Sequence, residues 1–174
     1  MAVHPIRILG DPVLRQKAKR VPSTLLRAGP KIDASIHKLI EDMIDSMRAA
    51  SGVGLAAPQI GVSLRVIVIG LPDEEPFVLI NPKMVKRSGE RQVEEGCLSV
   101  PGYRAELSRS ATVVVKGLDE QGHPRRIKAQ DDLLAQALEH EIDHINGILY
   151  IDHLPSLNAL VKVEPQETEE PARS

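Results

Sequence analysis

The strongest chemical pattern in the chain is H-E-I-D-H at residues 140–144, an H-E-x-x-H sequence inside a predicted helix. Histidines four residues apart project from one face of a helix, so both imidazoles can reach one metal ion. Glu141 lies on a neighbouring face, from which its carboxylate can reach a water beside that ion. The alternative is a pair of solvated histidines on a charged face, but the apolar residues around the pair disfavour it. The pattern therefore predicts a metal site with an adjacent acid or base.

Two histidines do not complete such a site, because a catalytic zinc-like centre has three protein ligands and one open position. The metzincin pattern would place a third histidine at the position of Tyr150, so that pattern fails. A thermolysin-like carboxylate would have to come from Glu164 onward, where prolines interrupt the sequence. Cys97 offers a thiolate, a strong ligand for Zn²⁺ or Fe²⁺, although a lone cysteine is more often an inert buried thiol. The residues alone leave Cys97 and a C-terminal glutamate both open.

Two further segments bear on that choice. Residues 94–102 surround Cys97 with a charged pair, a glycine and a Pro-Gly turn. Residues 52–61 are mostly small and end in a single amide side chain, Gln59, and their glycines let the backbone approach another chain closely. By itself this segment is equally well a tight turn before a strand, and it lacks the lysine of a phosphate-binding loop.

The elements that must position these residues follow from periodicity. Apolar residues at helical spacing predict a helix over 31–50, with Asp33 as N-cap, and another over 131–146. Asp131 or Asp132 would begin the second helix and Gly147 would follow its end. Short β-rich runs at 65–69, 77–80, 111–116 and 125–128 predict strands, the last two joined by a turn at 119–122. Helix, strands and helix in this order predict an α+β fold.

Composition restricts the class of protein. The 174 residues fit one catalytic domain over residues 1–163, followed by an acidic, proline-containing tail over 164–174 that we expect to be disordered. The net charge of −2 and the three aromatic residues disfavour a nucleic-acid site, and the apolar runs are too short to cross a bilayer. A single cysteine and the lack of a signal-like N-terminus predict a cytoplasmic protein.

Three motifs together resemble the peptide deformylase family. They are G-V-G-L-A-A-P-Q-I-G at residues 52–61, E-G-C-L-S at 95–99 and H-E-I-D-H at 140–144, and the likeness runs from residue 6 to residue 154. The resemblance implies an α+β fold in which antiparallel sheets surround a central helix that carries the H-E-x-x-H motif. It also implies a metal-dependent hydrolase that removes the N-terminal formyl group from formyl-methionine of newly made polypeptides and releases formate.

The resemblance carries roles onto the matching residues. It implies that Cys97, His140 and His144 bind one divalent ion, with Fe²⁺ the usual metal in the cell and Zn²⁺, Ni²⁺ or Co²⁺ as substitutes. Glu141 would be the general acid and base, while Gln59 and the backbone N–H of Leu98 would stabilise the oxyanion. The residues implied for contact with the substrate are Val53, Gly54, Leu133 and Ala137.

The expected partner is a formylated nascent polypeptide in the bacterial cytoplasm, with a transient ribosome contact, no direct nucleic-acid site and no membrane. Glu139 and Ser51 depart from the family, which commonly has glutamine before the H-E-x-x-H motif and an acidic residue before the glycine loop. Neither is a metal ligand, so the departures concern the surroundings of the site. A zinc peptidase and a metal-binding homologue without catalysis are the rival interpretations.

Overall fold

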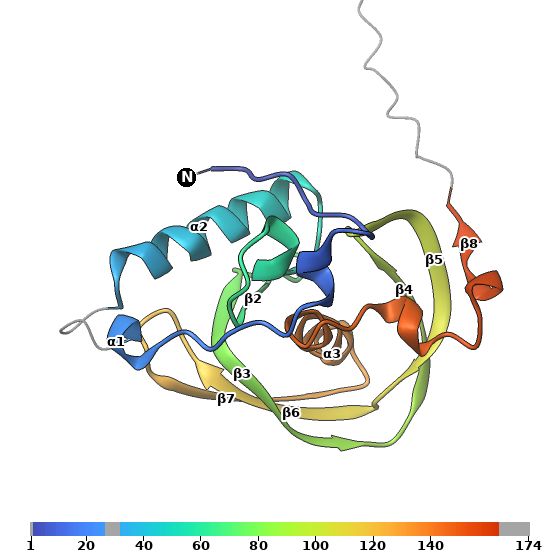
Figure 1. The fold of residues 1–174 in the computed structure, drawn as a ribbon. Helices are drawn as coiled ribbons and strands as arrows, with labels where there is room; N and C mark the ends of the chain where they lie inside the picture. The colour runs from blue at the N-terminus through green and yellow to red at the C-terminus, as the bar shows by residue number, and fades with distance from the viewer. Residues whose placement is uncertain (1, 27–31, 164–174) are drawn as a thin grey trace, which may run out of the picture.

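The computed structural model describes residues 2–26 and 32–163, so the tail over 164–174 lies outside the described residues. Figure 1 shows α3 (Leu133–Ile145) end-on near the centre of the molecule, with α2 (Ala34–Ala49) above it and the strands curving around it. The structure combines α-helices with antiparallel sheets that surround the central helix α3. This arrangement confirms the α+β class that the sequence predicts.

The strands described here form two sheets in which all neighbours are antiparallel. The larger sheet has the order β1-β2-β3-β6-β7 and the smaller one β4-β5-β8. Their bounds are β1 (Gly54–Ala56), β2 (Val66–Ile69), β3 (Phe77–Ser88), β4 (Arg91–Cys97), β5 (Val100–Arg109), β6 (Thr112–Leu118), β7 (Pro124–Gln130) and β8 (Val161–Lys162). Short helices connect them: η1 (Pro12–Arg15), α1 (Ser23–Leu26), η2 (Ala57–Ile60), η3 (Tyr150–His153) and η4 (Leu157–Ala159). Within residues 2–26 and 32–163, every helix is too short or too polar to cross a membrane.

Both long helices are capped as the sequence predicts. The Asp33 carboxylate accepts a hydrogen bond from the Ser35 N–H at 2.8 Å, and the Asp132 carboxylate accepts one from the Ala135 N–H at 2.9 Å. After α3, Gly147 has a φ of 75°, and a Cβ there would lie 2.7 Å from the carbonyl oxygen of Arg15. A side chain at residue 147 is therefore disfavoured twice, by the left-handed backbone and by the close approach. These features fix both ends of the helix that carries the metal motif.

The predicted strands are found as β2, β3, β6 and β7, and the turn between the last two is closed by a hydrogen bond from the Asp119 N–H to the His123 carbonyl. β3 is longer than expected, because it continues to Ser88 and pairs first with β2 and then with β6. β1, β4, β5 and β8 are not predicted by the local sequence pattern. The polar residues of β4 and the Pro-Gly start of β5 obscure any alternation of apolar and polar residues.

Opposite faces of α3 serve the core and the site. Leu138, Ile142 and Ile145 are buried in one apolar cluster with residues of β2, β3 and β6. His140 and His144 lie on the other face, which is turned towards β4. α2 belongs to a second cluster with β1 and β2, and a third cluster joins β4 and β5 to η3. The helix is thereby held between the larger sheet and the β4–β5 hairpin.

Candidate metal centre

A thiol and two imidazoles converge between β4 and α3. The Sγ of Cys97 lies 3.2 Å from the Nε2 of His144, which lies 3.2 Å from the Nε2 of His140. The three potential ligand atoms all lie within 4.8 Å of one another. His140 and His144 are buried, and Cys97 is half-buried at the wall of a pocket. The structure thus brings together the three residues that the sequence motifs imply as ligands.

Two local periodicities produce this convergence. His140 and His144 are one helical turn apart on α3, so their rings lie one above the other on the same face. Glu95 and Cys97 are two residues apart at the end of β4 and therefore point to the same side of that strand. Glu95 faces His140, with 2.7 Å between its Oε2 and the Nδ1 of the ring, and Cys97 faces His144.

The three side chains fit a transition-metal ion. Two imidazole nitrogens that share a tetrahedral ion at about 2.0–2.1 Å lie roughly 3.3 Å apart, close to the distance between these two Nε2 atoms. The Nδ1–H of His140 donates to Glu95, which leaves the lone pair on Nε2 free for a metal. One thiolate with two imidazoles is a donor set that first-row transition metals accept.

A buried ionic network holds the histidine side chains of this cluster in place. Arg109 donates to both oxygens of Glu95, at 3.0 and 2.5 Å, and to Asp143 at 2.7 Å. Asp143 also lies 2.8 Å from the Nε2 of His153. Burial opposes the charge of Glu95, but hydrogen bonds with His140 and Arg109 outweigh it and lower the pKa of this carboxyl to about 2. Glu95 is therefore an anion that orients the His140 ring.

Glu141 lies against the backbone of β1. A Cβ on Gly54 would come within 2.7 Å of the Oε1 of Glu141, so only glycine leaves room for the carboxylate. The other oxygen, Oε2, is buried and has no hydrogen-bond partner among the described residues. Burial raises the pKa of Glu141 to about 7. A buried carboxyl oxygen with a free lone pair at a pocket wall is suited to binding a proton donor.

Gln59 is fixed beside the same centre. Its Oε1 accepts a hydrogen bond from the Ala56 N–H at 2.9 Å, which directs the amide nitrogen towards Ser99 and Cys97. The Nε2 lies 3.1 Å from the Ser99 Oγ and 3.7 Å from the Cys97 Sγ. Leu98 follows Cys97 in the short connection between β4 and β5 and also lines the pocket. Two candidate hydrogen-bond donors thus flank the thiol.

The pocket beside the thiol has a volume of about 1,030 Å³. Its walls include all of the residues implied for contact with the substrate, namely Val53, Gly54, Leu133 and Ala137. β1 is the edge of the larger sheet and β4 the edge of the smaller one, and both contribute to these walls. The pocket therefore lies between two strand edges that can still pair with an extended chain.

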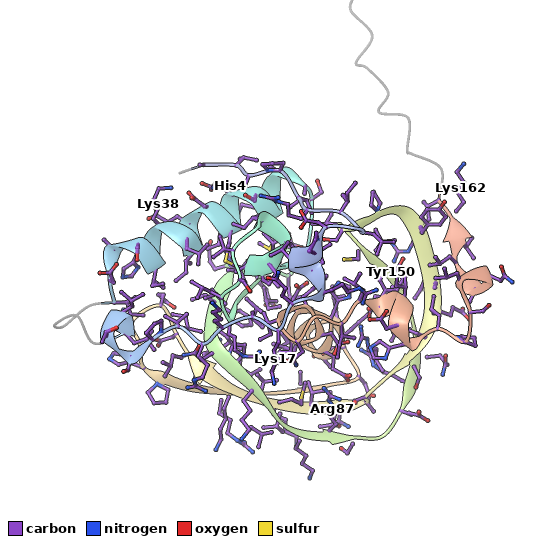
Figure 2. The ribbon with its side chains drawn as sticks, viewed as in Figure 1. His4, Lys17, Lys38, Arg87, Tyr150 and Lys162 are labelled. Carbon is purple, nitrogen blue, oxygen red and sulfur yellow. The ribbon has the colours of Figure 1, made fainter. Side chains whose placement is uncertain are left out.

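Several site residues were not predicted from the sequence. Arg109 belongs to no motif, and Asp143 occupies a position that the H-E-x-x-H pattern leaves unspecified. Arg109 also lies opposite Arg91 rather than Glu95 in the strand register. The spacing of Glu95 and Cys97 was the available signal for the carboxylate beside His140. Tyr150 stands where the metzincin pattern would have its third histidine. Its ring stacks on that of His140, with 6.3 Å between the ring centroids, and it is labelled near α3 in Figure 2.

The two departures from the family pattern have defined places. Glu139 is buried, and its carboxylate accepts a hydrogen bond from the Ser110 N–H at 2.7 Å, which ties α3 to the turn after β5. Ser51 has a φ of 54° and lines the pocket at the end of α2. The alternative carboxylate ligands from Glu164 onward lie outside the described residues.

Comparisons with known proteins all give one family. The family model described as "Polypeptide deformylase" matches residues 3–159. A peptide deformylase of Dehalococcoides mccartyi (strain CBDB1) is 54% identical over 168 residues, which cover 96% of this chain and 95% of that protein. The crystal structure of a peptide deformylase from Legionella pneumophila is 47% identical and has a TM-score of 0.80 over 88% of this chain and 86% of that chain. A class I type b peptide deformylase from Acinetobacter baumannii with Met-Ala-Ser bound is 32% identical, with a TM-score of 0.81 over 88% and 99% of the two chains.

Proposed function

Because this chain belongs to the polypeptide deformylase family, we propose that its Cys97, His140 and His144 hold the divalent metal ion on which deformylation depends. The chain is a hydrolase that removes the N-terminal formyl group from formyl-methionine of newly made polypeptides and releases formate. The observation that supports the metal assignment is the convergence of one thiol and two imidazoles from β4 and α3 within 4.8 Å of one another.

The metal is proposed to be Fe²⁺ in the cell, with Zn²⁺, Ni²⁺ or Co²⁺ as substitutes. When bound, such an ion polarises the formyl carbonyl and lowers the pKa of water towards neutrality. The donor set itself suits several ions, so the choice of iron follows the family resemblance. Metal analysis of protein purified without oxygen tests the proposal: near-equimolar iron supports it, and zinc under the same conditions contradicts it.

Glu141 is proposed to carry the proton. Its Oε2, which has no hydrogen-bond partner within residues 2–26 and 32–163, would accept a proton from the attacking water and then pass that proton to the leaving amine. The contact with Gly54 holds the carboxylate against the pocket wall, so the group needs no large movement between the two steps. Glu141 is not one of the proposed ligands, and its removal should therefore leave the metal in place.

Gln59 and the Leu98 N–H are proposed to stabilise the negative charge that develops on the formyl oxygen. The hydrogen bond from Ala56 fixes the Gln59 amide before substrate arrives, so little reorganisation is needed during the reaction. One donor of this kind typically lowers the barrier by about 3–4 kcal/mol.

The substrate is proposed to bind as an added strand between β1 and β4. Gly54 lies at the edge of the larger sheet and Gly96 at the edge of the smaller one, and both line the pocket. An extended peptide placed there could form main-chain hydrogen bonds with both sheets. Val53, Leu133 and Ala137 would then surround the methionine side chain, a role that suits their place in the pocket wall.

We also propose the extent of the catalytic domain, its cellular compartment and its contact with the ribosome. Residues 1–163 would act as one catalytic domain in the bacterial cytoplasm, and the enzyme would contact the ribosome transiently while its substrate emerges. Fractionation of cells that produce the tagged protein tests both points: activity in the soluble fraction and salt-sensitive cosedimentation with ribosomes are expected. Activity confined to the membrane fraction would contradict the cellular assignment.

One assay separates the enzyme from its rivals. Protein purified without oxygen is incubated with formyl-Met-Ala-Ser and with an unformylated casein fragment. Formate release without peptide cleavage is expected, whereas cleavage of casein would indicate a peptidase and neither product a non-catalytic metal protein. A Glu141→Ala variant should keep its metal and lose about 10²–10⁴-fold in turnover. Full activity in that variant would refute the proton-transfer role.

A further inference from the structure

A second hollow in the described structure is lined by five cationic residues and by no acidic one. It lies beside the C-terminal half of α3 and has a volume of about 520 Å³. The cations are Lys17, Arg20, Arg65, Lys83 and Arg87. Within residues 2–26 and 32–163, none of the five takes part in an ion pair. We call this hollow the basic groove. The net charge of −2 gives no hint of it, because the fold gathers these residues from three separate segments.

The three segments meet through backbone contacts. The loop after η1 is tied to the start of β2, since the Lys19 N–H donates to the Ser63 carbonyl and the Arg65 N–H donates to the Lys19 carbonyl. The register shift in β3 after Met84 places Arg87 opposite Val113. Val113 is buried against α3, so Arg87 shares the sheet face that α3 covers. Figure 2 labels Lys17 and Arg87 on the same half of the molecule, below α3 in that view.

The charge in the basic groove is not neutralised by the protein. Arg65 donates to the Ile145 carbonyl at 3.0 Å and to the Asn146 Oδ1 at 2.9 Å, which are neutral acceptors at the end of α3. The helix terminus carries only a partial negative charge, against the four full positive charges of Lys17, Arg20, Arg65 and Arg87. Burial, and then the positive charge of Arg20, lower the pKa of Arg65. Like charges held together in this way repel one another, and a bound anion would relieve that repulsion.

We propose that the basic groove is a docking surface for the phosphate backbone of RNA. Lys17, Arg20 and Arg87 are exposed, so they can contact an extended polyanion that lies across the groove. Lys83 lies opposite Lys116 in the register, so its side chain points to the other face of the sheet and only its backbone side borders the groove. No aromatic residue lines the groove among the described residues, so bases have nothing to stack on and the contact is with phosphates, independent of sequence. Acidic residues elsewhere on the chain are screened beyond about 8 Å at physiological ionic strength. An enzyme whose substrate emerges from the ribosome meets such a surface in ribosomal RNA.

The helix α3 separates the basic groove from the substrate pocket. Ile142 and Asn146 line the groove, whereas Leu133 and Ala137 line the pocket. With about 100° between successive residues, Ile142 points roughly 180° away from Leu133. RNA bound in the groove therefore leaves the pocket open, and RNA binding and deformylation can be lost independently.

The experiment measures binding of the metal-loaded enzyme to a fluorescein-labelled RNA duplex by fluorescence anisotropy at several KCl concentrations. The test variant is K17E/R87E, and R48E/K128E is the matched control, because its two residues are also exposed, lie outside the groove and change the net charge equally. K17E/R87E should bind at least about tenfold more weakly at low salt, and the magnitude of its slope of log K against log salt should fall by about two. The control should bind RNA as the wild type does, and both variants should hydrolyse formyl-Met-Ala-Ser normally.

Equal RNA affinity in the two double variants would overturn the proposal, and so would a wild-type enzyme that fails to bind RNA at low salt. If K17E/R87E does not fold, K17E/R20E in the exposed loop asks the same question. Titrations with inorganic phosphate and with ATP form a second arm. Saturable binding of either one without RNA binding would assign the groove to a small anion and refute the RNA interface.

Discussion

Replacing Gly54 with alanine should disable the reaction while leaving the metal site intact. The new Cβ would lie 2.7 Å from the Oε1 of Glu141 and 3.0 Å from its Cγ. Non-bonded heavy atoms prefer separations of about 3.5–4.0 Å, so the carboxylate would have to retreat by roughly 0.5–1 Å. Gly54 lies in the extended strand β1 and has no positive φ, so alanine adds no backbone strain.

The expected cost follows from that displacement. A misplacement of about 1 Å in a reacting geometry costs about 10²-fold in rate, which corresponds to about 2.7 kcal/mol. Glu141 is not a proposed ligand, so the metal content should not change. The loss should appear in kcat rather than in KM, because the interaction that is lost acts in the transition state.

Initial rates of formate release from formyl-Met-Ala-Ser, metal analysis and thermal unfolding together test this reasoning. Gly70→Ala is the matched control, because the one close contact of its Cβ would be with the flexible end of Met47, outside the pocket, while Pro76 would lie at an ordinary 3.7 Å. The control should keep its turnover despite an equally close contact. Wild-type kcat in Gly54→Ala, or a loss of activity that follows a loss of metal, would refute the proposed contact with Glu141.

Three further predictions concern stability and specificity. Arg109→Met should lower the free energy of unfolding by about 3–5 kcal/mol, since it leaves two buried carboxylates without their cation; urea unfolding should show a much smaller loss for Arg104→Met, at an exposed ion pair. The hydrogen bond with Lys38 is the main cause that lowers the pKa of Asp42 from 3.8 to about 2, so the stability it contributes should be lost as the pH falls from 4 to 2. When the free energy of unfolding is measured against pH, Asp42→Asn should lack this part of the acid loss. A pH profile identical to that of the wild type would contradict the prediction. Ala137→Leu should raise KM for formyl-Met peptides by filling the pocket, and an unchanged KM would exclude this residue from the methionine site.

The two long helices could be predicted because each buries a stripe of apolar residues and begins at an aspartate cap. β4 and β5 could not, because their exposed positions carry polar residues and the start of β5 contains proline and glycine. A hairpin of this kind is defined by its pairing and by its packing on η3, neither of which is written in a local pattern. Local patterns therefore predicted α3, which carries the H-E-x-x-H motif, but not β4, the strand that faces it.

The same distinction applies to the site. His140 and His144 were predictable from their spacing alone, since a helix brings residues four apart onto one face. Cys97 required knowledge of which strand lies beside α3, and only the family resemblance supplied it. Arg109 depends on the three-dimensional course of β5, because the strand register places it opposite Arg91 and away from the carboxylate it binds. Contacts of this kind follow from the fold and leave no trace in the spacing of residues.

In the proposed binding mode, the shortness of β1 limits how much of a polypeptide pairs with the enzyme. Three residues of extended chain span about 10 Å, so this edge can align with only the first few residues of a client. Whatever follows them is free to vary in sequence, length and folding. Because the paired stretch is so short, one catalyst can process the products of very many genes. It can also act as soon as a few residues are accessible, before the rest of the chain exists.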